Sequence, residues 1–193
     1  MILQFIVSTA TIERNMKDMN YKCKVILNSI GPYPAKFAVD YSPYRNCYAH
    51  ALNCMYEDSD YSVYSPGAIT AAFNDSDCDN DDGEFYFRAD LSIKLIKRDC
   101  SALSINAFGC DYDSKLHENE SKIALTYSKA DNDFHFLRQN ADGSWSHKPG
   151  WGDARRSLIP SELIPYHGES HIEIGGAPYK VIEILQLQKR VGS

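Results

Sequence analysis

The stretch "DFHFLRQNADGSWSHK", residues 133–148, decides the fold class. Apolar and polar residues alternate over 133–138, which is typical of a β-strand. The residues "NADG", 140–143, suit a type I turn followed by a glycine bulge, and this turn implies a three-residue loop. Residues 144–148 then form the returning strand. The stretch therefore predicts an antiparallel β-hairpin.

The register of this hairpin is predicted to place two histidines on one face. With a three-residue loop, Asn140 pairs with Ser144, and His147 lies opposite Leu137. His135 and His147 are then diagonal neighbours, and their side chains are close enough to meet. A loop one residue longer would reverse the assignment of faces.

Helices are predicted before the hairpin and further strands on both sides of it. Apolar residues recur at helical spacing, or caps and charges mark a helix, over 46–56, 68–73 and 84–98. Strand patterns occupy 122–128 and 179–187. Residues 2–10 are interpreted as a strand or an ordered N-terminal arm, and residues 22–30 as a short strand or an apolar segment. Helices first and an antiparallel sheet second predict an α+β fold. We expect one domain, 1–193, with its core over about 40–190 and an N-terminal extension over 1–40.

Charge and hydrophobicity exclude some classes of partner. The net charge is -6, and no run of Lys and Arg occurs, which argues against a nucleic-acid partner. The apolar residues 2–10 are too short to span a bilayer and have no basic residue before them. We therefore expect no membrane span, and either a cytoplasmic protein or one exported without a cleaved signal peptide.

No metal or organic cofactor is expected. The 6 cysteines include no CxxC pair, and their spacing fits no zinc site. Asp75, Asp77, Asp79 and Asp81 alternate in an acidic loop that resembles a calcium-binding loop. This loop lacks the glycine and the glutamate that an EF-hand requires, so we interpret it as a solvated loop.

Cys47 is the candidate nucleophile. It follows Asn46, the predicted N-cap of the helix over 46–56, where backbone N–H groups and a positive partial charge favour a thiolate. The alternative is a small, buried structural cysteine. A nucleophilic cysteine also needs a base within hydrogen-bond reach. His135 is the best candidate, because Phe134 and Phe136 on either side of it must face the core; a buried histidine bonded to a backbone carbonyl is the alternative.

Two residues compete to orient the imidazole of His135. His147 shares its face in the predicted hairpin, whereas Asp153 lies in "GWGDA", 150–154, a loop that its glycines allow to fold back. His50, one turn after Cys47, is interpreted as an ordinary helix residue. Trp145 and Trp151 either line a substrate groove or close the core. No role is assigned to the remaining histidines, His117, His167 and His171.

Together these residues resemble the papain-like cysteine hydrolase superfamily, and most closely its NlpC/P60 type. The shared features are a cysteine at the start of a helix, a base histidine in a hairpin, and a polar residue on the next strand, over roughly 44–150. Some bacterial effector proteases have the same order of parts. The chain departs from NlpC/P60 proteins at Asn46-Cys47-Tyr48-Ala49, where these proteins have Asp-Cys-Ser-Gly, and no glutamine stands shortly before Cys47.

The resemblance implies a papain-like fold, in which a helical lobe with the nucleophile helix packs on an antiparallel sheet. It implies a peptidase or amidase acting on a protein, peptide or other amide substrate. Cys47 would attack the carbonyl, His135 would transfer the proton, and His147 or Asp153 would hold the imidazole. Acyl transfer or deamidation on the same scaffold, and a non-catalytic interaction module, are the alternatives.

Overall fold

A computed structural model of the chain describes residues 8–10, 25–27, 46–56, 66, 67, 69, 89–149, 155–157 and 172–190. Within these residues the helices are α1 (Cys47–Leu52) and α2 (Ala89–Ala102). The strands are β1 (Ser8–Ala10), β2 (Val25–Leu27), β3 (Cys54–Tyr56), β4 (Ile105–Gly109), β5 (Glu120–Ser128), β6 (Asp133–Gln139), β7 (Trp145–His147), β8 (Arg155–Ser157), β9 (Ile172–Ile174) and β10 (Ala177–Lys189).

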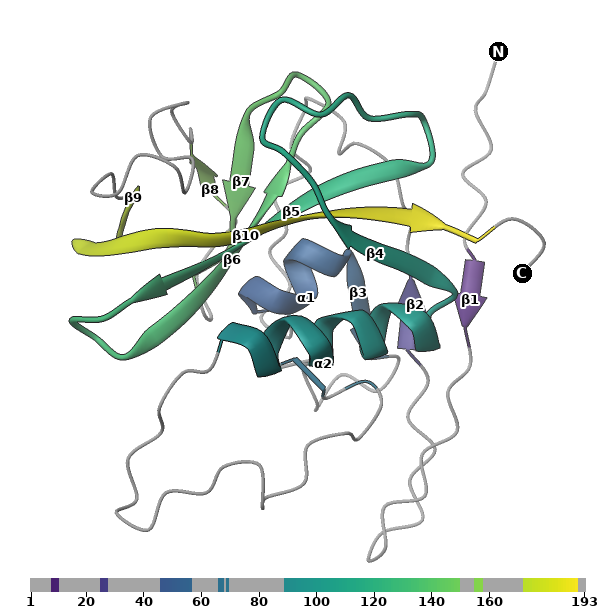
Figure 1. Cartoon of the computed structure of the whole chain (residues 1–193), viewed down its shortest axis with the longest axis horizontal. Helices are drawn as coiled ribbons and strands as arrows, with labels where there is room; N and C mark the ends of the chain where they lie inside the picture. The colour runs from purple at the N-terminus through teal and green to yellow at the C-terminus, as the bar shows by residue number, and fades with distance from the viewer. Residues whose placement is uncertain are drawn as a thin grey trace, which may run out of the picture.

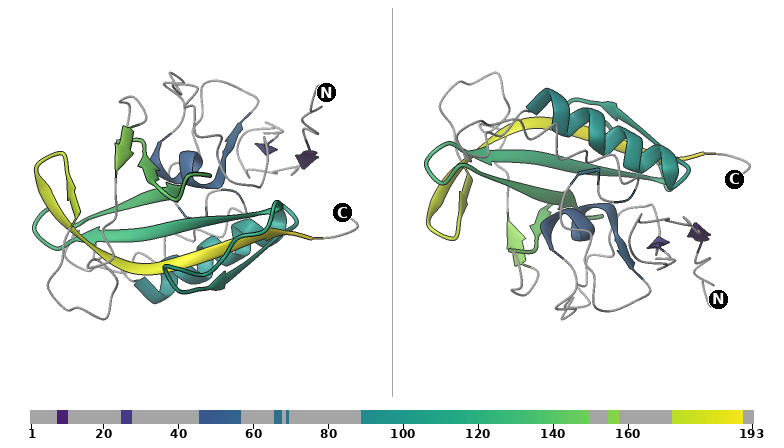
Figure 2. Two further views of the ribbon diagram at one scale, coloured as in Figure 1. Left: turned by 90° about the horizontal axis from the view of Figure 1, so that it is seen from above. Right: turned by 90° about the horizontal axis from the view of Figure 1, so that it is seen from below.

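The larger sheet is antiparallel and has the order β4-β10-β5-β6-β7-β8, with β9 paired to β10. The last strand of the chain, β10, pairs with both β4 and β5 and so lies inside the sheet (Figure 1). A bulge between Val181 and Glu183 interrupts its pairing with β5. Bulges increase local twist, and Figure 2 shows β10 curving along its length and turning into β9. This sheet and the two helices confirm the predicted α+β class.

The start of α1 was predicted, but its end was not. Asn46 is the N-cap, and its side chain accepts a hydrogen bond from the N–H of Ala49 at 3.0 Å. The prediction of a helix through residue 56 is wrong, because α1 ends at Leu52. Asn53 adopts left-handed angles, φ 53 and ψ 41, and its N–H caps the last turn. The next residues form β3, which pairs with β2 in a small sheet of order β1-β2-β3.

The second helix is displaced from its predicted range. It was expected over 84–98, and within the described residues α2 begins at Ala89 and continues to Ala102. Of the short helix expected over 68–73, only Ile69 is described, and it lies in a turn. The acidic loop at 75–84 lies outside the described residues.

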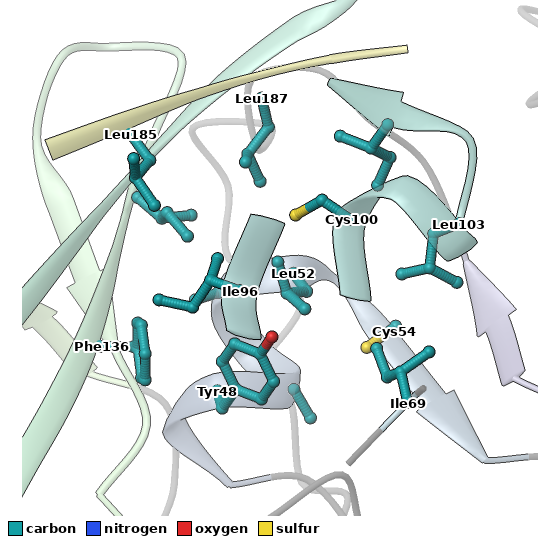
Figure 3. Close-up of a cluster of buried hydrophobic side chains, with 14 of the residues drawn as sticks. Tyr48, Leu52, Cys54, Ile69, Ile96, Cys100, Leu103, Phe136, Leu185 and Leu187 are labelled. Atoms are coloured by element: carbon teal, nitrogen blue, oxygen red, sulfur yellow. The ribbon is translucent and has the colours of Figure 1, made fainter. Parts of the chain in front are cut away.

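Both helices pack on one face of the larger sheet. The Tyr48 ring of α1 lies 4.9 Å from the Phe136 ring of β6, and its hydroxyl donates a 2.9 Å hydrogen bond to Asp99 of α2. Asp99 also accepts a 2.7 Å hydrogen bond from the N–H of Gly67. Figure 3 shows the buried side chains of this first core cluster, which include Tyr48, Leu52, Ile96, Cys100, Leu103, Phe136, Leu185 and Leu187.

A second core cluster covers the opposite face of the sheet. Phe136 belongs to the first cluster, whereas Leu137, the next residue of β6, belongs to the second. Successive side chains of a strand point to opposite faces, so His135 shares the face of Leu137. The other buried members of the second cluster are Ala124, Trp145, Ile172, Ile174, Tyr179, Val181 and Ile184.

Candidate functional site

The β6–β7 hairpin has the predicted register. Leu137 is paired with His147. Asn140 donates from its N–H to the carbonyl of Ser144 at 2.7 Å and accepts from the N–H of Gly143 at 3.0 Å. Gly143 has a φ of 82, the left-handed conformation that a glycine bulge requires. The three-residue loop is therefore confirmed, and with it the shared face of His135 and His147.

The two histidines of the hairpin are joined by a hydrogen bond. His135 Nε2 and His147 Nδ1 lie 2.9 Å apart, with their rings at 79°. One nitrogen donates and the other accepts, so each ring holds the tautomer of the other. Burial lowers the pKa of His135 from 6.5 to about 3, and the charge of His147 contributes in the same direction. The His135 imidazole is therefore neutral at neutral pH.

Two residues that were not predicted as site residues lie beside this pair. The Tyr179 ring of β10 is 6.0 Å from the His135 ring, and its hydroxyl donates a 2.8 Å hydrogen bond to the Asp133 carboxylate. Burial raises the pKa of Tyr179, and the bond to Asp133 raises it further. Strand alternation could have identified Asp133, which shares the face of His135. Tyr179 could not be found, because its position depends on the pairing of β10 with β5.

The Cys47 thiol is buried, with only 8% of the residue exposed. Burial raises its pKa from 9.0 to about 12, and the Asp133 carboxylate raises it as well. Backbone hydrogen bonds from Phe136, Tyr48 and Cys47 itself lower it, so they must come from N–H groups that stabilise a thiolate. The expectation of an easily ionised thiol is therefore wrong. The loss of hydration raises the pKa of the thiol by more than the N-terminus of α1, a helix of 6 residues, lowers it.

The thiol and the imidazole flank the same part of β6. The backbone of Phe136, the residue after His135, is close enough to the thiol to lower its pKa. However, Phe136 faces α1 and His135 faces the other side of the sheet. Among the contacts of the described residues, no hydrogen bond joins the Cys47 thiol to the His135 ring. The structure thus joins His135 to His147, but does not join His135 to Cys47.

The other candidates contribute to packing, are exposed, or lie outside the described residues. His50 is buried, and its Nε2 lies 3.3 Å from Ser146 Oγ. Trp145 is buried in the second core cluster and stacks on Tyr112 at 6.2 Å, so it closes the core. His117 is exposed. Four of the candidates lie outside the described ranges: Asp153, Trp151, His167 and His171. Of the two residues predicted to orient His135, the structure therefore describes only His147.

The remaining findings concern metal ligands, membrane-spanning helices and similarity to known proteins. In the part of the chain that the structure describes, no group of His, Cys, Asp and Glu side chains is arranged to hold a metal ion. No described helix combines the length and hydrophobicity needed to cross a membrane. Searches with protein-family models, among curated proteins and among solved structures found no match to this chain.

Proposed function

We propose that the chain is a cysteine hydrolase, a peptidase or amidase of papain-like fold, in which Cys47 is the nucleophile and His135 the base. The observation that carries this proposal is the 2.9 Å hydrogen bond between His135 Nε2 and His147 Nδ1. In a catalytic triad, a third group fixes the tautomer and orientation of the base. His147 has this relation to His135, and the backbone of the next residue of the hairpin, Phe136, lowers the pKa of the Cys47 thiol.

The resting state holds a neutral thiol and a neutral imidazole, because burial raises the pKa of Cys47 to about 12 and lowers that of His135 to about 3. Proton transfer must therefore accompany attack on the substrate rather than precede it. His135 Nδ1 is the ring nitrogen not bonded to His147, so it would take the thiol proton. Substrate binding has to bring thiol and ring within hydrogen-bond reach, since they are not bonded in this structure.

The chemical step forms a bond between Cys47 Sγ and the substrate carbonyl carbon. The backbone N–H groups that lower the pKa of the thiol would also stabilise the oxyanion that forms. The imidazolium of His135 then protonates the leaving amine, which leaves a thioester on Cys47. Water, deprotonated by His135, releases the acid and restores the thiol. An amine acceptor in place of water would give acyl transfer.

A non-catalytic interaction module is the second candidate. Two observations favour it: the raised pKa of the Cys47 thiol, and the absence of a thiol–imidazole hydrogen bond among the described contacts. A module of this kind would keep the buried histidine pair as part of its core.

Variants of the proposed site distinguish these candidates. The purified chain would be assayed on a panel of fluorogenic amides and esters. Cys47→Ala and His135→Asn should each reduce turnover at least about a hundredfold. Cys110→Ala and the exposed-residue variant His117→Asn should leave it unchanged. Turnover that survives Cys47→Ala would contradict the proposal. Added hydroxylamine would convert an acyl group on Cys47 to a hydroxamate, which tests whether the reaction passes through a thioester, with water or an amine as the final acceptor.

A further inference from the structure

The Tyr179 side chain crosses one strand of the larger sheet to reach Asp133. The strand order places β5 between β10, which carries Tyr179, and β6, which carries Asp133 (Figure 1). Asp133 pairs with Ser128 of β5, a small and fully buried residue, and Lys180 pairs with Tyr127, so Tyr179 comes next to Ser128. The small serine leaves room for the tyrosine, whose hydroxyl donates its 2.8 Å hydrogen bond to Asp133 Oδ2.

The His135 ring contacts both His147 and Tyr179. His147 Nδ1 lies 2.9 Å from His135 Nε2, and the centroids of the Tyr179 and His135 rings are 6.0 Å apart, with the rings at 63°. All three residues are buried. Tilted aromatic pairs at this distance attract each other, and a buried ring with two such contacts has little freedom to rotate. Tyr179 therefore limits the rotation of the ring that His147 orients.

Asp133 offers a negative charge that His147 cannot offer. When His135 takes the thiol proton it becomes an imidazolium, and a buried cation is costly without a counter-charge. In a Ser-His-Asp triad the carboxylate of the third residue supplies this charge, but an imidazole has none. Asp133 lies two residues before His135 on the same face of β6, so their Cα atoms are roughly 7 Å apart. Within the part of the chain that the structure describes, the Asp133 carboxylate has no cationic partner.

Given the hydrolase function proposed above, we propose that Asp133 and Tyr179 are positioning residues of the base: Tyr179 holds the His135 ring beside His147, and Asp133 stabilises the imidazolium that forms during the reaction. The same carboxylate disfavours the Cys47 thiolate, so it favours the protonated form of both the thiol and the base. Removal of its charge should therefore make the thiol ionise more easily and make the base less effective.

The rates of two reactions of Cys47 test the role of Asp133. Asp133→Asn should increase the rate of Cys47 alkylation by iodoacetamide, because the thiolate is less disfavoured. It should decrease kcat for a fluorogenic amide about tenfold or more, with KM changed less than about twofold. Cys54 and Cys100 are buried in the same core cluster as Cys47. Their alkylation, mapped by mass spectrometry in the same samples, reports any opening of the core and should be unchanged.

Asp131→Asn is the matched control for Asp133→Asn. It removes a charge from an exposed residue in the turn before β6, and it should change neither rate by more than about twofold. Alkylation or turnover that is unchanged in Asp133→Asn would overturn the role of Asp133. Faster alkylation of Cys54 and Cys100 together with Cys47 would overturn it as well, because the substitution would then have opened the core.

Nitrogen-15 NMR of the histidine side chains tests the role of Tyr179 without any substrate. In the wild type His135 should be protonated at Nε2 and not at Nδ1, because Nδ1 has to accept the thiol proton. Tyr179→Phe keeps the ring and should keep this tautomer, whereas Tyr179→Leu should give a mixture of tautomers. Tyr127→Leu is the control, because Tyr127 pairs with Phe134 on the opposite face of the sheet, and it should leave the His135 signals unchanged.

Failure of the positioning role and failure of the hydrolase function give different results. Thermal melting first shows that each variant is folded. A single His135 tautomer in Tyr179→Leu, as in the wild type, would overturn the positioning role of Tyr179. No turnover by the wild type would contradict the hydrolase function and with it the role of Asp133, whereas the tautomers of His135 would still decide the role of Tyr179.

Discussion

At the residue scale, the Cys47 thiol is subject to two opposing influences. Backbone N–H groups stabilise its thiolate, but burial favours the neutral thiol more strongly. The position of Cys47 after an N-cap was readable from the sequence, because capping is local. The burial of the thiol was not, because it depends on β6, a strand far along the chain.

The first prediction concerns the order in which the thiols react with an alkylating agent. Cys54 and Cys100 are buried like Cys47, whereas Cys110 is half-buried. Alkylation requires access and a thiolate, so among these four cysteines iodoacetamide should label Cys110 first. Mass-mapped labelling at neutral pH, in a chain with Cys23 and Cys78 replaced by serine, measures the order. Labelling of Cys47 ahead of Cys110 would show that the thiol is more exposed and more acidic than described.

At the element scale, α1 contacts both the sheet, through Tyr48 and Phe136, and α2, through Tyr48 and Asp99. Phe136 of β6 is fully buried against Tyr48, while Phe108 of β4 is 40% exposed. Phe136→Ala should therefore lower the free energy of unfolding by about 3–5 kcal/mol. Phe108→Ala, the matched control, should change it by less than about 1 kcal/mol. Urea unfolding of both variants tests this, and similar losses would mean that the first core cluster is not packed as described.

A second element-scale prediction concerns the contact between α1 and α2. The Tyr48 hydroxyl donates to Asp99, which also accepts from the N–H of Gly67. Tyr48→Phe keeps the ring but leaves one acceptor of the buried carboxylate unsatisfied, so it should cost roughly 1–3 kcal/mol. Tyr127→Phe is the control, because the Tyr127 hydroxyl bonds to Asn132 in an exposed contact. Equal urea midpoints for the two variants would contradict the role given to Asp99.

Local chemistry explains which elements the sequence predicted well. The hairpin register follows from the turn residues 140–143, and the start of α1 follows from Asn46. The end of α1 depends on β2, which pairs with residues 54–56 from a distant part of the chain. A helical pattern over 46–56 cannot reveal this competition. The strands β4, β8 and β9 also escaped prediction, because each depends on a partner strand more than on its own residues.

At the scale of the whole molecule, the order of strands in the larger sheet could not be predicted from the sequence. Antiparallel pairing could be predicted, but not that β10, the last strand, lies between β4 and β5. This order brings Tyr179 of β10 to the histidine pair and its hydroxyl to Asp133 of β6. The contact between these two side chains therefore depends on pairing between distant segments, which no local sequence pattern indicates.

The stability of the whole chain should depend on pH through His135. Its pKa is about 3 in the folded protein and 6.5 when unperturbed, so between these values the unfolded chain binds more protons. The contribution of neutral His135 to the free energy of unfolding should be fully present above pH 6.5. It should be lost as the pH is lowered toward 3, by an amount on the order of a few kcal/mol.

Urea unfolding of wild type and His135→Asn between pH 7 and pH 4 measures this contribution. The variant cannot take up the proton, so its stability should depend less steeply on pH over this range. His117→Asn, which replaces an exposed histidine, should keep the wild-type slope. The same slope in wild type and His135→Asn would show that His135 is not buried in its neutral form.

The site of acylation tests the central claim, that Cys47 is a nucleophile assisted by His135. The chain would be mixed with activated esters at neutral pH, quenched in acid and mapped by mass spectrometry. A thioester is expected on Cys47, even though iodoacetamide should prefer Cys110, because acyl transfer uses the His135 base and the N–H groups around the sulfur. This thioester should be absent in Cys47→Ala and strongly reduced in His135→Asn. An acyl group on Cys110 instead, or Cys47 acylation that is equal in wild type and His135→Asn, would contradict the account.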